Sequence, residues 1–132
     1  MANPNIAALT TLTGNTTYYT PSGTTAVVLL PNAAASGQVF RINQITATNV
    51  NGSAAVNATV SIYTNGAVAQ GSAPSGGTAY PIASTISVPA DATLIVTDKT
   101  TSFYLLENQS IGATAGTASD LVVTASWEEI NS

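Results

Sequence analysis

The side chains in this sequence best suited to acid–base chemistry are six carboxylates, because the chain contains no histidine and no cysteine. Paired carboxylates are the catalytic groups of most glycoside hydrolases, so a two-carboxylate hydrolase is the enzyme class to consider first. Most of these acids fall in or beside expected turns, and no concentration of aromatic residues indicates a platform for a sugar ring. We therefore expect no enzymatic activity, no catalytic residue and no cofactor. The six carboxylates are those of Asp91, Asp98, Glu107, Asp120, Glu128 and Glu129.

A calcium site is the other chemistry that carboxylates support, since Ca²⁺ binds carboxylate and carbonyl oxygens. The acids are widely spaced, however, and no acidic run of the calcium-loop type is present. The adjacent pair Glu128 and Glu129 is explained more simply as a solvated strand end, or as a guard against unwanted strand pairing. The absence of cysteine also excludes thiolate metal sites and disulfides. We expect no metal site within the chain. A cation bound between subunits is the alternative that the sequence leaves open.

Charged residues are unusually scarce, and this limits the partners that the chain can bind. They make up 6% of the sequence, with a net charge of −4, whereas a typical soluble protein has about 25% charged residues. Nucleic acids and anionic membranes are bound through several cationic side chains, and here Arg41 and Lys99 are the only two. Hydrophobic residues make up 45%, which is enough for a folded core. A neutral surface repels its own copies weakly, so we expect self-association and neither nucleic-acid nor membrane binding.

The elements that position these side chains are predicted to be β-strands, because apolar and polar residues alternate with a period of two. Residues 56–64, 80–88 and 121–128 show this alternation most clearly. In the second of these runs, Ile82 and Ile86 lie on the apolar side, which faces the core in a half-buried strand. Shorter strands are expected at residues 6–12, 16–20, 26–30, 94–97, 102–106 and 110–114.

Residues 39–50 change phase near Asn43 and Gln44, which predicts a β-bulge or bend of the kind found in a long strand that changes sheet. Glycine, proline and asparagine separate the predicted strands, for example at residues 13–15. About eight or more short strands with such punctuation are typical of an all-β, antiparallel β-sandwich or jelly roll. We expect residues 1–132 to form a single domain of this class. The large aromatic residues assigned to its core are Phe40, Phe103 and Trp127.

Two segments outside the strands and one aromatic pair are the candidate contacts of an assembly. Residues 1–5 are expected to form a flexible arm, and residues 64–78 a long exposed loop, since loops of this length are usually functional or disordered. Adjacent tyrosines on a strand face opposite ways, so one of Tyr18 and Tyr19 is expected to be exposed. The candidate contact residues are Asn3, Pro4, Asn5, Tyr18, Tyr19, Gly71, Pro74, Gly76 and Gly77.

Several of these strand and turn segments resemble small structural proteins of tailed bacteriophages, particularly those of marine cyanobacterial phages. The likeness begins with Val39-Phe40-Arg41-Ile42-Asn43-Gln44-Ile45, covers most of the chain from there onward, and includes residues 2–6. It consists of strand and turn patterns, and no catalytic signature is among them. The other segments that carry it are residues 47–52, 58–63, 82–94, 104–111 and 126–130.

The resemblance implies a non-enzymatic virion component, first of all a capsid decoration or cement protein that stabilises the shell by packing on it and on copies of itself. The implied partners are further copies, in a homo-oligomer such as a trimer, and the major capsid protein or another virion protein. A tail or neck component and a carbohydrate- or receptor-binding module are the alternatives, because sandwiches and jelly rolls also serve as lectins. The sequence shows no secretory signal, so we expect assembly in the host cytoplasm.

Overall fold

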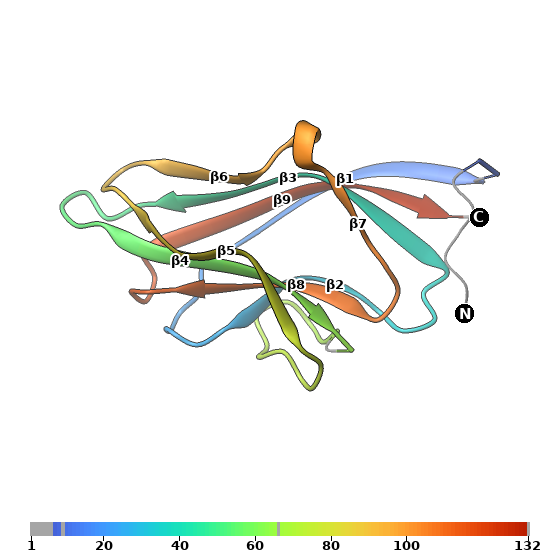
Figure 1. The fold of residues 1–132 in the computed structure, drawn as a ribbon, viewed down its shortest axis with the longest axis horizontal. Helices are drawn as coiled ribbons and strands as arrows, with labels where there is room; N and C mark the ends of the chain where they lie inside the picture. The colour runs from blue at the N-terminus through green and yellow to red at the C-terminus, as the bar shows by residue number, and fades with distance from the viewer. Residues whose placement is uncertain (1–6, 9, 66, 132) are drawn as a thin grey trace.

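The computed structural model describes residues 7–131 except residues 9 and 66. Within this part of the chain, nine β-strands and one short 3₁₀ turn form the regular structure (Figure 1). No described helix is long and apolar enough to cross a membrane. The elements are β1 (Thr11–Tyr19), β2 (Val27–Asn32), β3 (Gln38–Asn49), β4 (Val56–Thr64), β5 (Ala79–Val88), β6 (Thr93–Thr97), η1 (Lys99–Thr101), β7 (Phe103–Leu105), β8 (Gln109–Ala115) and β9 (Leu121–Asn131).

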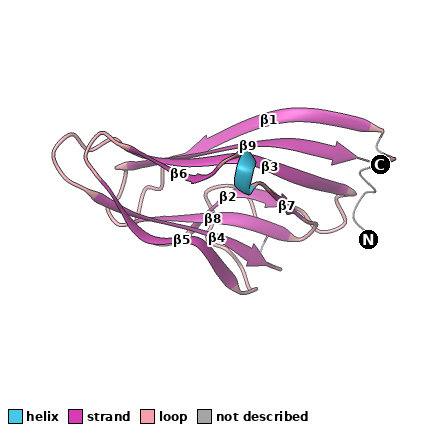
Figure 2. Cartoon of the chain, turned by 45° about the horizontal axis from the view of Figure 1, so that its top comes forward, coloured by secondary structure: helices cyan, strands magenta, loops and turns pink. Residues whose placement is uncertain are grey.

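The strands form two antiparallel sheets that pack face to face (Figure 2). Sheet A has the order β1-β9-β3-β6, with β7 also paired to β3, and sheet B has the order β2-β8-β4-β5. Apolar side chains of both sheets meet between them, among them the fully buried Leu29, Ile42 and Ile111. Burying one such side chain stabilises the fold by about 1.5–3 kcal/mol. The predicted all-β, antiparallel sandwich is confirmed, while the single domain over residues 1–132 stays a prediction.

The aromatic residues assigned to the core all contact it. Phe40 is buried, and Phe103 and Trp127 are half-buried and pack against the core cluster. The rings of Phe40 and Trp127 lie 5.8 Å apart between centroids and are tilted to each other. Such aromatic pairs stabilise a fold by about 0.5–1.5 kcal/mol beyond the area that they bury.

Strand β3 carries the predicted β-bulge but stays in one sheet along its whole length. Its register with β9 shifts between Ile42 and Gln44, where the sequence pattern changes phase. On its other edge, β3 pairs with β7 up to Ile42 and with β6 from Ile45 onward. The expectation of a strand that changes sheet is therefore wrong, because the bulge instead separates two short neighbours, which η1 connects.

Strand β1 is continuous, whereas the sequence pattern predicts two strands, at 6–12 and 16–20, with a turn at Gly14. Every residue from Thr11 to Tyr19 has a partner in β9. Strand β9 is long enough to pair with the whole of β1, and a glycine on an edge strand removes little packing, so the ladder runs through it. Part of the first predicted strand lies outside the described residues.

Strand β5 departs from its predicted alternation. Ile82 and Ile86 are 38% and 40% exposed, and among the apolar residues of β5 only Val88 is buried. The register of β5 with β4 shifts twice around Val60, and Thr85 adopts a left-handed φ of 50°. These irregularities change the phase of the side chains between Pro81 and Ile86, but Ile86 still opposes the core residue Ala58, so its exposure shows that the other sheet does not cover it. The prediction that both isoleucines face a closed core is wrong.

Two buried asparagines connect the sheets at opposite ends of β3. Asn32, the last residue of β2 in sheet B, donates from Nδ2 to the backbone oxygens of Gln38 and Leu105 in sheet A, at 3.1 and 3.2 Å. Its Oδ1 accepts a hydrogen bond from Ser36 Oγ at 2.6 Å. The pair Pro31-Asn32 is of a type that predicts a turn, but these hydrogen bonds hold the Asn32 amide inside the sandwich.

Asn49, the last residue of β3 in sheet A, makes the corresponding connection to sheet B. Its Nδ2 donates to the backbone oxygens of Val88 at 3.0 Å and Ala54 at 2.8 Å. Its Oδ1 accepts from the backbone N–H of Asn51 at 2.8 Å. A satisfied hydrogen bond stabilises a fold by about 0.5–1.5 kcal/mol, whereas a buried group left without its partner destabilises it by about 1–3 kcal/mol.

Replacing Asn49 with aspartate is expected to lower the free energy of unfolding by at least about 3 kcal/mol, because a buried carboxylate would face three carbonyl oxygens, those of Ala54, Val88 and Pro89, with no proton to donate. Asn57→Asp is the matched control, since Asn57 is exposed on β4, and it should change the free energy by less than about 0.5 kcal/mol. Urea denaturation at neutral pH measures both. Equal effects of the two substitutions would contradict the structural role of Asn49.

Candidate assembly surface

The predicted contact residues are spread over three places, of which the structure describes two. Asn3, Pro4 and Asn5 lie outside the described residues. Tyr18 and Tyr19 face opposite sides of β1: Tyr18 is 71% exposed on the outer face of sheet A, and Tyr19 packs against the core. Tyr18 is therefore the member of the pair that a partner can reach, and its role as a contact stays a prediction.

The loop between β4 and β5 is mostly exposed, but its middle is fixed to sheet B. The N–H of Gly71 donates to the oxygen of Val28, and the N–H of Val28 donates to the oxygen of Ser72, each at 2.8 Å. The Gln70 side chain adds a 2.8 Å hydrogen bond to the oxygen of Leu29. Because β2 is an edge strand, the loop protects an edge that would otherwise present free backbone groups.

Two of the loop glycines predicted as contacts have structural roles of their own. Gly71 has a φ of +87°, and a Cβ at this position would lie 2.8 Å from the hydroxyl oxygen of Tyr19. Gly77 has a φ of +70°, and a Cβ there would collide with the backbone oxygen of Thr64. The conformation of the loop explains both glycines without a partner. The other two predicted loop contacts are the half-buried Pro74 and the exposed Gly76.

The outer face of sheet A carries an array of uncharged side chains from four neighbouring strands. In one row, Tyr18 of β1 opposes Thr124 of β9, which in turn opposes Thr46 of β3. Thr46 opposes Ile95 of β6 on its other side. The rows on either side have the same character. We call this array the threonine face; its residues are Thr16, Tyr18, Gln44, Thr46, Thr48, Thr93, Ile95, Val122, Thr124 and Ser126.

Hydrogen bonds between hydroxyl groups satisfy part of the threonine face internally. Thr16 is joined to Ser126, and Thr48 to Thr93, each at 2.9 Å between the side-chain oxygens. At the β6 edge, Ile95 is 58% exposed and supplies apolar area. Since no residue of the face is charged, a partner that covers it removes no ion from water. The face therefore suits contact with another neutral protein surface.

The threonine face is small for a protein–protein interface. Four strands about 4.8 Å apart, with about five residues of 3.3 Å each, give roughly 19 by 17 Å, or about 300 Å². A standard interface buries about 800 Å² on each partner. One copy would bind through this face with low affinity. Several linked copies on one surface would bind with much higher overall affinity.

Charged side chains begin beside the β3 bulge, where the threonine face ends. A hollow of about 440 Å³ is lined by polar residues that include Asn43, Asp98 and Lys99. Asn43 Nδ2 donates to Glu128 Oε1 at 2.9 Å. Asp98 accepts from the hydroxyl and the backbone N–H of Thr100, at 2.6 and 3.0 Å, and these bonds lower the pKa of Asp98 below 3.8. Among the described residues, no group of three acidic side chains is placed to hold a metal ion.

Comparison with known proteins gives likenesses in structure alone. No family model and no curated protein sequence matches the chain. It aligns with a chain of the T13 IBDV viral particle at a TM-score of 0.50 and 7% identity, covering 94% of this chain and 32% of that one. It also aligns with the infectious bursal disease virus VP2 subviral particle, at a TM-score of 0.45 and 12% identity, covering 94% and 34%. The chain thus spans about a third of these proteins, and the first likeness shows a shared fold.

Thr100→Val is expected to raise the pKa of Asp98 towards 3.8, because it removes the hydroxyl donor and keeps the shape of the side chain. The carboxyl resonance of Asp98 in an NMR pH titration measures the change, and Thr93→Val on the threonine face is the control. A lowered folded-state pKa stabilises the fold above pH 3.8, and this contribution is lost as the pH falls through the folded-state pKa. An unchanged pKa in Thr100→Val would refute the assigned cause.

Proposed function

We propose that this chain is a structural protein of a bacteriophage virion that decorates and cements the capsid by packing on the shell and on copies of itself, without enzymatic activity. The observation that carries the proposal is the threonine face, which a neutral protein surface can cover without desolvating any charge. Its small area favours a protein that acts in many copies on one lattice. The protein is then located in the assembled virion.

Two further observations support a virion role. The chain shares its sandwich fold with a chain of the T13 IBDV viral particle, and its segments from residue 39 onward resemble phage structural proteins. A shared fold alone does not establish a function, so the proposal depends on the surface of this chain. The proposed partners are copies of the chain itself and the major capsid protein or another protein of the shell.

The proposed mechanism is the summation of weak contacts. Hydroxyl pairs such as Thr48 and Thr93 keep their mutual hydrogen bond when the face is covered, so covering them leaves few polar groups without a partner. Tyr18 and Ile95, at the two edges of the face, supply apolar area that is removed from water. A copy that spans two shell subunits resists their separation, and connected copies reinforce one another.

Immunogold electron microscopy of intact virions, with antibody against the recombinant protein, tests the location. We expect label spread evenly over the head. Label confined to the tail or neck would reject decoration of the capsid and assign the protein to the tail or neck. Absence of the protein from purified virions would reject a structural role altogether, and a glycan array would then test the carbohydrate-binding alternative.

Thr46→Lys and Thr124→Lys are expected to weaken binding to capsids that lack the protein by at least about tenfold, since each introduces a charge that loses its hydration at the contact. Thr24→Lys is the matched control, because Thr24 is exposed in the connection between β1 and β2. Co-sedimentation of each folded variant with stripped capsids gives the dissociation constants. If the control binds as weakly as the two variants, net charge and not the threonine face controls binding.

A further inference from the structure

The inner side of β5 presents side chains of the core type that remain exposed. In the pairing of β5 with β4, Tyr80 opposes Ile62, and Ile86 opposes Ala58. Opposed residues point to the same side of a sheet, and both Ile62 and Ala58 belong to or pack against the core between the sheets. Tyr80 is nevertheless 59% exposed and Ile86 40% exposed. Sheet A therefore leaves the inner side of β5 partly uncovered.

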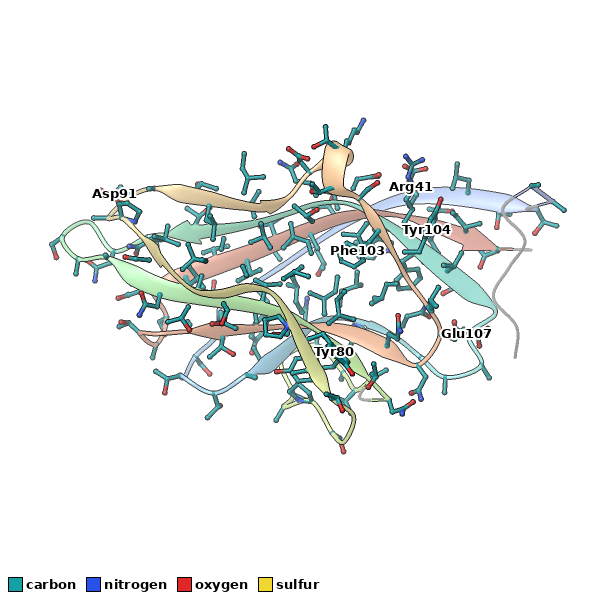
Figure 3. All side chains as sticks on the ribbon, in the orientation of Figure 1. Arg41, Tyr80, Asp91, Phe103, Tyr104 and Glu107 are labelled. Atoms are coloured by element: carbon teal, nitrogen blue, oxygen red, sulfur yellow. The ribbon has the colours of Figure 1, made fainter. Side chains whose placement is uncertain are left out.

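The short strands at the edge of sheet A explain this opening. Strand β5 has ten residues, whereas β6 has five and β7 has three, with η1 between them. In Figures 1 and 2 the start of β5 diverges from β7. Figure 3 shows Tyr80 and Phe103 on the two strands that border the opening. The two sheets are closed over most of their area but open along this side.

A hollow of about 280 Å³ lies in the opening, lined by Ile82 of β5, Val96 of β6, Phe103 of β7 and two threonines. We call this hollow, together with the exposed apolar residues on the inner side of β5, the apolar trough. Contiguous apolar patches of about 300–600 Å² are the largest on a typical monomer, and they are often functional. The residues of the apolar trough are Tyr80, Ile82, Ile86, Val96 and Phe103.

We propose that a second copy of this chain covers the apolar trough, with each copy placing its own trough against that of the other about a two-fold axis. This deepens the proposed function, because it names the surface used between copies, and it is distinct from the threonine face proposed to contact the shell. A two-fold contact uses the same patch on both copies, so the patch has to be complementary to itself. An apolar strip meets this condition, because apolar side chains attract without regard to sign or direction.

The distribution of charge favours a second copy as the occupant. The chain has a net charge of −4, so two copies repel each other wherever their acidic side chains approach. Residues 78–88 contain no charged residue, and neither do the other members of the apolar trough. The charged residues nearest in sequence to the lining are Asp98 and Lys99, which have opposite signs and lie between Thr97 and Thr101, so identical acidic chains can meet on this side with little net repulsion.

The size of the trough is suited to the centre of a dimer interface. The seven residues from Tyr80 to Ile86 at about 3.3 Å each, and a spacing of about 10 Å between packed sheets, give roughly 230 Å². A standard interface covers about 800 Å² on each partner and has an apolar centre within a polar rim. Thr101, which also lines the hollow and is exposed, is placed at such a rim, whereas Thr97 is buried beneath it and shares a 2.6 Å hydrogen bond with its hydroxyl group.

The backbone of β5 disfavours an added β-strand as the occupant. Pro81 has no N–H to donate, and the left-handed φ of 50° at Thr85 interrupts the extended conformation. An extended peptide or a strand exchanged between copies would need a regular ladder along this edge. The contact is therefore made by side chains of the trough, and each copy keeps all of its own strands.

Ile86→Lys and Ile95→Lys form a matched pair for the test, because both isoleucines are exposed, at 40% and 58%, and they lie on the trough and on the threonine face respectively. Sedimentation of the purified full chain should give twice the chain mass for the wild type and for Ile95→Lys. Ile86→Lys should dissociate at least tenfold more readily while its circular dichroism stays that of the folded chain, and its thermal unfolding should match that of the wild type diluted until it dissociates. If Ile86→Lys fails to fold, Tyr80→Lys takes its place.

Because the chain has no cysteine, single cysteines report directly on which side two copies share. Ile82→Cys, at a position that lines the hollow of the trough, is expected to form a disulfide-linked dimer under mild oxidation, and Ser53→Cys in the connection between β3 and β4 is the exposed control. A monomeric or trimeric wild type, or a dimer dissociated by Ile95→Lys and not by Ile86→Lys, would overturn the inference. None of these results depends on the virion, so the proposed function and this inference can fail separately.

Discussion

The position of one sheet over the other depends on two buried amides, those of Asn32 and Asn49. Apolar packing holds the sheets together but has no direction, so it does not fix how far one slides over the other. The hydrogen bonds from Asn32 to the oxygen of Leu105 and from Asn49 to the oxygen of Val88 do fix it, because a buried amide tolerates little loss of geometry. In a chain with 6% charged residues, these neutral groups provide the specificity that ion pairs provide elsewhere.

The threonine face and the apolar trough both result from the same irregularity in β3. The bulge between Ile42 and Gln44 divides the free edge of β3 between β7 and β6. On the outer side, β6 extends the row of hydroxyl groups to a fourth strand. On the inner side, the same short strands do not reach across β5, and core side chains stay exposed. One local irregularity thus gives the molecule a polar face and an apolar opening, which suit different partners.

The sequence predicts the local features of this fold better than the relations between strands. The bulge near Asn43 and the strand at residues 56–64 follow from alternation within one segment. The exposure of Ile86 depends on how far strands of the other sheet reach, and no pattern within residues 80–88 contains that information. The alternating hydroxyl residues of single strands, such as Thr46 and Thr48, are visible in the sequence, but their alignment into one face requires the strand order. The hydrogen bonds of Asn32 and Asn49 to the opposite sheet also depend on how the strands are arranged, which no single segment of the sequence shows.

The place of β9 in sheet A has a consequence for the order of events after synthesis. It is the last of the nine described strands, yet it lies between β1 and β3 and pairs with both along its length. While the ribosome still holds residues 121–131, β1 and β3 have no common neighbour, and the core side of β3 stays uncovered along the edge that β9 later pairs with. Chains dominated by such distant pairings fold slowly, in milliseconds to seconds, and are prone to aggregate in the interval. The chain is thus most prone to aggregate before β9 joins the sheet, and a change in β9 that slows its pairing would lengthen that interval.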